Sequence, residues 1–137
     1  MRPALFYRIA AVVNLLFALG HTVGFLTFHP RAAEGQAAAK AMQMVFQEDG
    51  TPFSYANFYK GFGLNITLTM LLVAAWSWWL AGMARSTPRA TIVPGTALLA
   101  YQIGGLVLAV LFFPAPAILF SAGLAALFAI AVAGAAR

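Results

Sequence analysis

Several polar side chains interrupt long apolar stretches of this sequence, and they are the residues whose types could support chemistry. An unpaired polar group in hydrocarbon costs free energy, so these side chains are expected to face other helices. Counting about 1.5 Å per residue from the outer end of each stretch places them at two depths. The shallower layer contains His21, Thr22, Asn65 and Ser121, and the deeper layer contains Asn14, Thr69, Tyr101 and Gln102.

The spacing of these residues predicts a common side on each helix. Asn14 and His21 lie seven residues apart in the first apolar stretch, which places both on one stripe of a helix. Asn65 and Thr69 lie four residues apart in the second stretch, and they also share a stripe. We therefore expect both stripes to face the inside of a helix bundle.

Three interpretations of the polar layers are open. In the first, the side chains form hydrogen bonds between helices, each worth about 0.6 kcal/mol. In the second, they line an outward-facing pocket for a lipid-like or small apolar ligand, or for a membrane partner. In the third, they belong to an interface in an oligomer. The residues of the predicted pocket are His21, Asn14, Asn65, Thr69, Tyr101, Gln102, Lys60, Glu48 and Asp49.

A membrane-embedded enzyme or carrier is the alternative function. His21 would act as a general base and would have to recruit Glu48 or Asp49 from a loop, because no acid lies within an apolar stretch. The absence of cysteine excludes a thiolate nucleophile, a disulfide and a Cys-based zinc or iron–sulfur site. We expect no metal and no cofactor, since the two histidines are eight residues apart and cannot share one ion on a single helix.

The composition identifies the bilayer as the solvent for most of the chain. Of 137 residues, 63% are hydrophobic and only 8% are charged, against about 25% charged residues in soluble domains. The mean hydropathy is +0.87. The net charge is +5, but the basic residues stand singly at the ends of apolar stretches and form no basic stripe with interleaved aromatics. This arrangement is typical of topology signals, and it excludes a nucleic-acid partner.

The apolar pattern predicts an all-α membrane protein with a four-transmembrane-helix bundle in one membrane domain, residues 1–137. Each predicted span is long enough to cross roughly 30 Å of hydrocarbon. Between the first two spans, residues 30–56 form a polar outer loop whose Ala-rich first part predicts a short amphipathic helix, with Ala38, Val45 and Phe46 on its apolar face. A turn is predicted at residues 48–52. The spans are about 5–28, 57–83, 91–113 and 117–136.

The distribution of charge predicts the orientation in the membrane. Five arginines and no acid lie on one side of the predicted spans, whereas three basic residues and all three acids lie on the other. The positive-inside rule then predicts that both termini lie in the cytoplasm. The predicted location is the inner membrane of the cell. The first group is Arg2, Arg8, Arg85, Arg89 and Arg137, and the second contains Arg31, Lys40 and Lys60.

Two motifs resemble those of a group of small bacterial integral membrane proteins of unassigned function. They are GHT-x-GF at residues 20–25 and FY-x-GFGL at residues 58–64, followed by a tryptophan-rich end of the second span. The resemblance covers the whole chain. It implies a four-span inner-membrane protein and assigns neither an activity nor catalytic residues.

Overall fold

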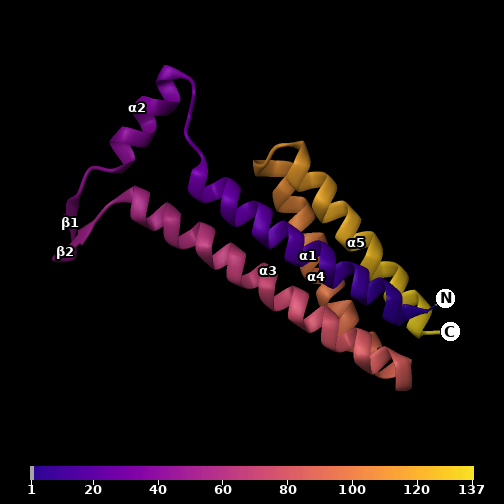
Figure 1. Ribbon diagram of the computed structural model, residues 1–137. Coiled ribbons are helices and arrows are strands. Elements are labelled where there is room, and N and C mark those ends of the chain that lie inside the picture. The colour runs from indigo at the N-terminus through magenta and orange to yellow at the C-terminus, as the bar shows by residue number, and fades with distance from the viewer. Residues whose placement is uncertain (1) are drawn as a thin grey trace. The chain divides into compact units, whose positions relative to one another are not determined.

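Four long apolar helices dominate the computed structural model, which describes residues 2–137 (Figure 1). They are α1 (Pro3–Thr27), α3 (Tyr55–Ser86), α4 (Ile92–Phe112) and α5 (Ala115–Ala135). Each of the four, with the short 3-10 helix η1 (Pro88–Thr91) leading into α4, is long and apolar enough to cross a bilayer. The chain is therefore a multi-pass, all-α membrane protein, which confirms the predicted fold class.

The observed spans begin and end within about two residues of the predicted ones, except at α3. This helix starts at Tyr55 and ends at Ser86, while the prediction was 57–83. Its early start has a local cause, because the buried Ser54 caps it. The Ser54 hydroxyl oxygen accepts a hydrogen bond from the Asn57 backbone N–H at 3.3 Å, which satisfies a donor that has no partner within the helix.

The contacts of the chain fall into two compact units, which are described separately. One, called the bundle unit, consists of residues up to Leu16 together with Leu71–Arg137. The other, called the hairpin unit, is Phe17–Met70. Helices α1 and α3 each contribute one part to both units.

The bundle unit has a core built from α1, α3 and α5, against which α4 packs. Tyr7 of α1 and Phe128 of α5 are fully buried, with ring centroids 6.4 Å apart. Most of the other core residues are alanines and leucines, and the alanines allow helix backbones to approach closely. Leu98 and Leu99 of α4 pack against this core. Its members are Tyr7, Ala10, Val73, Leu80, Ala81, Ala84, Leu124, Phe128 and Ala131.

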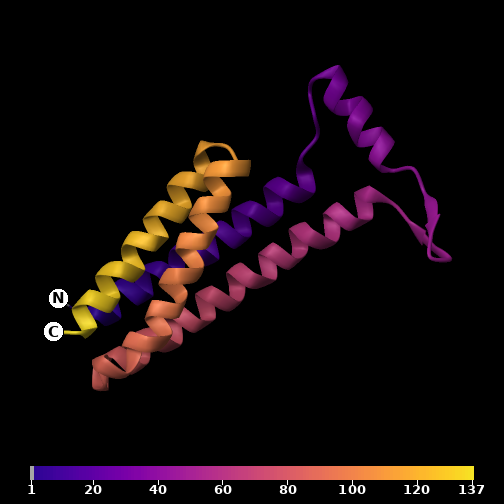
Figure 2. The ribbon, with the colours of Figure 1, turned by 180° about the vertical axis from the view of Figure 1, so that it is seen from behind.

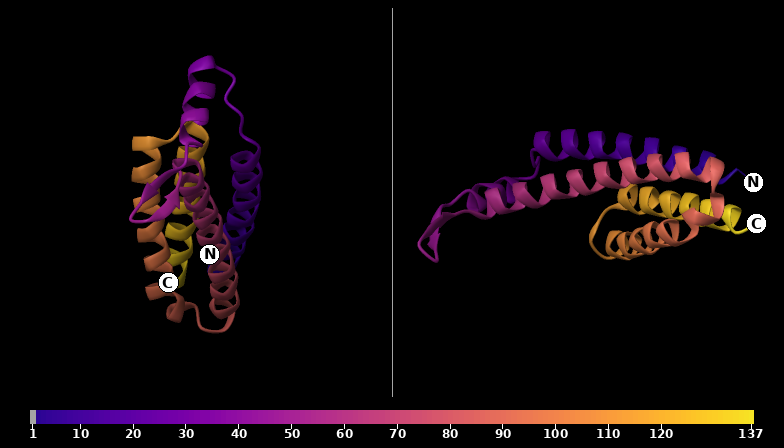
Figure 3. Two further views of the ribbon diagram at one scale, coloured as in Figure 1. Left: turned by 90° about the vertical axis from the view of Figure 1, so that its left-hand side faces the viewer. Right: turned by 90° about the horizontal axis from the view of Figure 1, so that it is seen from below.

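Tyr7 also ties α1 to the beginning of α4. Its hydroxyl donates a hydrogen bond to the Thr91 carbonyl oxygen at 3.3 Å. The ring fits there because Gly95 has no side chain: a methyl group at this position would overlap the Tyr7 hydroxyl. Helices α4 and α5 run antiparallel beside each other, joined through Pro114 (Figure 2). The first turns of α1 and the last turn of α5 lie at the same end of the unit (Figure 3).

The hairpin unit contains the second half of α1, the first half of α3 and the connection between them. This connection holds a short helix, α2 (Ala33–Met42), and two strands, β1 (Phe46–Glu48) and β2 (Thr51–Phe53). The predicted amphipathic helix is present but ends at Met42, so Val45 and Phe46 lie outside it. The predicted turn is also present, but the two strands beside it were not foreseen.

The turn at Asp49 and Gly50 sets the register of the strands. Both residues have positive φ, +47° and +75°, which is the combination of a type I′ turn. The antiparallel pairs are Phe46 with Phe53, Gln47 with Pro52 and Glu48 with Thr51. In a two-residue hairpin, the pair next to the turn exchanges hydrogen bonds and the following pair does not. Pro52 occupies this second pair, where its missing N–H costs no bond between the strands.

Candidate functional site

His21 lies half-buried on α1 and bonds to the backbone of α3. Its Nε2 is 3.2 Å from the Gly63 carbonyl oxygen. A carbonyl oxygen only accepts, so the imidazole must donate its Nε2 proton to Gly63. The Phe25 ring stacks on the imidazole at 5.8 Å, with the two planes 8° apart. His21 is thus held by one hydrogen bond and one ring contact.

Two threonine hydroxyls join the same helices one turn away. Thr22 Oγ1 and Thr67 Oγ1 are 2.9 Å apart. Thr22 also lies 2.7 Å from the Ala18 carbonyl oxygen, to which its hydroxyl donates. The Thr67 hydroxyl lies within reach of both Thr22 Oγ1 and the Gly63 carbonyl oxygen, which is 3.3 Å away, and it can donate to either. The Gly63 carbonyl has two lone pairs and can accept from His21 and Thr67 together. Each polar group in this cluster has a partner.

Within the hairpin unit, the side of α3 that contacts α1 differs from the side that the polar spacing predicts. The residues that meet His21, Thr22 and Phe25 are Tyr59, Gly63 and Thr67, which recur every four residues. Asn65, two positions from Gly63 and so nearly opposite it on the helix, is exposed. Thr69 donates to the Asn65 carbonyl oxygen at 2.9 Å on its own helix. The structure therefore brings His21 to a glycine carbonyl and not to the Asn65 amide.

Gly63 is the position that permits this close contact. A Cβ atom built there would overlap the Phe25 ring, which lies directly over the glycine. Phe25 in turn contacts the Tyr59 ring at 5.4 Å. The glycine thus makes room for the ring, and its carbonyl oxygen accepts from the imidazole.

The predicted deeper layer is divided between the units. In the bundle unit, Asn14 is buried and its amide donates to the Ala10 carbonyl oxygen on its own helix at 3.0 Å. Gln102 is buried beside Gly105, whereas Tyr101 is 51% exposed. Thr69 belongs to the hairpin unit. Within residues 2–137, every fully buried side-chain nitrogen or oxygen has a hydrogen-bond partner.

The three charged residues of the predicted pocket are all exposed. Glu48 and Asp49 lie at the tip of the strands, and Lys60 lies in the second turn of α3. Within the hairpin unit, the two strands project away from the end of α1 (Figures 1 and 2). The structure therefore does not bring either acid to His21. Among the described residues, no three His, Cys, Asp or Glu side chains lie close enough to hold a metal ion.

An aromatic cluster at the strands and the start of α3 was missed by the sequence reasoning. Phe53 is its centre, with ring centroids 5.2 Å from Phe46, 5.6 Å from Tyr55 and 5.7 Å from Phe58. Phe46 also contacts Tyr55 at 5.5 Å, and Phe58 contacts Phe62 at 4.8 Å. The signal for it was the Asp49-Gly50 pair, which predicts a hairpin that sets Phe46 opposite Phe53.

The cluster is ordered by its own contacts and yet open on its outside. Tyr55, Phe58 and Phe62 are each more than half exposed, at 58%, 53% and 59%. Rings that contact each other at these distances have little freedom left to lose on binding. The arrangement can therefore take up an apolar molecule at low entropic cost.

No protein-family model, no curated protein and no solved structure matches this chain.

Proposed function

We propose that this chain is a non-enzymatic protein of the inner membrane that binds a lipid-like or small apolar molecule. The binding surface is the aromatic cluster of Phe46, Phe53, Tyr55, Phe58 and Phe62, on the outer side of the membrane. Both termini lie in the cytoplasm. The observation that carries this proposal is a set of five rings in mutual contact, three of which are more than half exposed.

The position of the cluster along α3 supports binding at the membrane surface. The Arg8 guanidinium lies 5.7 Å from the centre of the Trp78 ring, a pairing suited to the interface between headgroups and hydrocarbon. Phe58 precedes Trp78 by 20 residues in the sequence, which is about the number of helical residues that crosses the hydrocarbon core. The proposal assigns the two residues to opposite interfaces.

His21 is connected by ring contacts to the turn of α3 next to the proposed surface. Its stacked partner Phe25 contacts Tyr59, which is 61% exposed and lies next to Phe58 in the sequence. Glu48, Asp49 and Lys60 are exposed on the same strands and helix turn that carry the cluster, so charged groups accompany the rings in the sequence, which suits a molecule with a polar end and an apolar body. In this proposal His21 positions the surface and transfers no proton.

Native mass spectrometry of gently extracted protein tests the proposal. We expect the wild-type chain to retain an apolar small molecule. Phe53→Ala removes the ring that contacts three others, and Phe58→Ala removes an exposed one. Because each ring contact contributes about 0.5–1.5 kcal/mol, we expect about tenfold less retention in either variant.

Leu119→Ala is the matched control. Leu119 is an apolar residue of α5 that is 73% exposed and is not a member of the cluster, so its truncation removes a similar kind of exposed apolar surface. We expect this variant to retain as much of the molecule as the wild type does. Equal retention in all four proteins would contradict the proposal, and so would retention of a second protein chain in place of a small molecule.

A further inference from the structure

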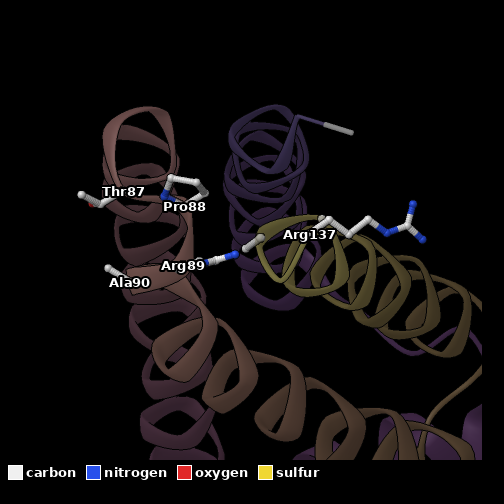
Figure 4. Close-up of a pocket in the computed structure, with 7 residues that line it drawn as sticks. Thr87, Pro88, Arg89, Ala90 and Arg137 are labelled. Carbon is white, nitrogen blue, oxygen red and sulfur yellow. The ribbon is translucent and has the colours of Figure 1, made fainter.

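The bundle unit contains an open groove with a volume of about 510 Å³. One wall is the turn between α3 and α4, with Thr87, Arg89 and Ala90, and the other is the end of α5, with Gly134 and Arg137. Figure 4 shows the Arg89 side chain extending toward the last turn of α5, and the Arg137 guanidinium directed away from Arg89 toward the open side.

The charged side chains that line this groove are both arginines. The bundle unit contains five arginines, whereas Glu34, Glu48 and Asp49, the three acids of the chain, all lie in the hairpin unit. Arg89 and Arg137 are exposed and have no side-chain carboxylate in their own unit with which to pair. Arg89 points across the recess and Arg137 lines it with its guanidinium turned outward, so the two arginines meet on an anion in the recess when the Arg137 side chain turns inward.

The groove lies within reach of lipid phosphates. With Arg8 and Trp78, which belong to the same unit, taken as the level of the interface, Ser86 at the end of α3 lies eight residues further along. This distance is about 12 Å for an upright helix and less for a tilted one. The polar layer of a bilayer occupies roughly 5–8 Å on each side of the hydrocarbon, so the backbone of the turn lies just outside the headgroups, and the long arginine side chains reach back to them.

We propose that this groove binds the phosphate group of an anionic membrane lipid. The planar guanidinium groups of Arg89 and Arg137 each donate paired hydrogen bonds to phosphate oxygens, with Arg137 turning inward. The small residues Ala90 and Gly134 leave the space that the headgroup occupies. The proposal uses residues of the bundle unit alone and does not depend on the aromatic cluster.

Lipid retention by the full chain tests the site. The purified protein is placed in micelles doped with phosphatidylglycerol or with zwitterionic phosphatidylcholine, and retained lipids are counted by native mass spectrometry. We expect the wild type to prefer phosphatidylglycerol. Each of Arg89→Gln and Arg137→Gln should lower its retention roughly fivefold, and the double variant by about 25-fold.

Two further variants separate a built site from general surface charge. Arg85→Gln removes the same charge from an exposed residue at the end of α3 that does not line the groove, and should change retention less than about twofold. Gly134→Leu adds a side chain to the α5 wall of the groove while preserving every charge, and should lower retention as the arginine variants do. Circular dichroism should give the same helix content for all of them.

Three results would overturn the proposal. One is an equal loss of phosphatidylglycerol in Arg85→Gln and in the double variant, which would make the effect one of net charge. Another is full retention in Gly134→Leu. The third is displacement of the lipid by millimolar inorganic phosphate, which would assign the groove to a free anion and not to a lipid.

Discussion

At the scale of single residues, the polar groups of the hairpin unit are organised around a glycine. The Gly63 carbonyl accepts from His21, and the absence of a Gly63 side chain leaves room for Phe25. Phe25 is itself held between the His21 imidazole and the Tyr59 ring. The Phe25 ring therefore cannot move away from a new methyl group at residue 63 without giving up a ring contact.

Gly63→Ala should loosen the pairing of α1 with α3. We expect a loss of about 1–3 kcal/mol in the free energy of unfolding, because the new methyl displaces Phe25 from its stack. Titration with sodium dodecyl sulfate, followed by circular dichroism, measures this free energy. Adding Phe25→Ala to Gly63→Ala should recover part of the loss, because removing the ring relieves the overlap that the new methyl group creates.

Gly61→Ala is the control for this substitution. It lies one position before Phe62 on the same helix, but a Cβ at Gly61 meets no atom within 4 Å. Alanine favours a helix over glycine by up to about 1 kcal/mol, so we expect Gly61→Ala to be neutral or stabilising. Equal destabilisation by the two substitutions would contradict the account of Gly63.

The sequence predicted part of the polar cluster, and the reason for the rest is physical. His21 was selected correctly as a polar group that needs a partner, and Thr22 was placed in the same layer. The partner could not be predicted from polar spacing, because Gly63 acts through its backbone, and every residue has a carbonyl. Asn65 appeared a better partner by residue type, but the packing of Phe25 on Gly63 turns another side of α3 toward His21.

At the scale of elements, the long helices were predicted better than the connection between the first two. Sustained apolarity over about 20 residues is a strong signal, and it gave all four spans nearly the right limits. The strands have only three residues each, which is too short for an alternating pattern to show. The Asp49-Gly50 pair indicates a hairpin with a strand on each side, but only the turn was predicted from it.

Gly50→Ala should open the hairpin locally. Gly50 has a φ of +75°, and a side chain in that conformation costs about 1 kcal/mol or more. We expect an endoproteinase that cleaves after glutamate to cut at Glu48 about fivefold faster in the variant, since cleavage follows the population of the open form.

Glu34 provides an internal standard for this measurement. It lies in the first turn of α2, outside the strands, and should be cut at the same rate in both proteins. Faster cleavage at both glutamates would indicate a general loosening of the connection and would contradict a role limited to the turn.

At the scale of the whole molecule, the segregation of charge predicts the orientation that we propose. Every acid lies between the first two spans, and five of the eight basic residues lie beyond the opposite ends of the spans or close to them. Four crossings return the chain to the side from which it began. The absence of native cysteine makes this arrangement directly measurable, because an introduced cysteine has no competitor.

Single cysteines should react according to their side of the membrane. Gln47→Cys lies in β1 and Ser86→Cys lies at the end of α3, and both side chains are exposed. In intact spheroplasts we expect a membrane-impermeant maleimide to label Gln47→Cys alone, and to label Ser86→Cys only after permeabilisation. The reverse pattern would place the termini outside and overturn the proposed topology.

Pro52 has a consequence beyond its fit within the hairpin. Of the three residues of β2, Thr51 and Phe53 direct their N–H groups toward β1, so only residue 52 could present a donor on the outer edge. A proline has none, so the outer edge of β2 presents only the Pro52 carbonyl oxygen and pairs poorly with a strand of another chain. This limits the growth of intermolecular sheets from an aromatic-rich strand. Along the β2 edge, recognition is therefore left mainly to side chains.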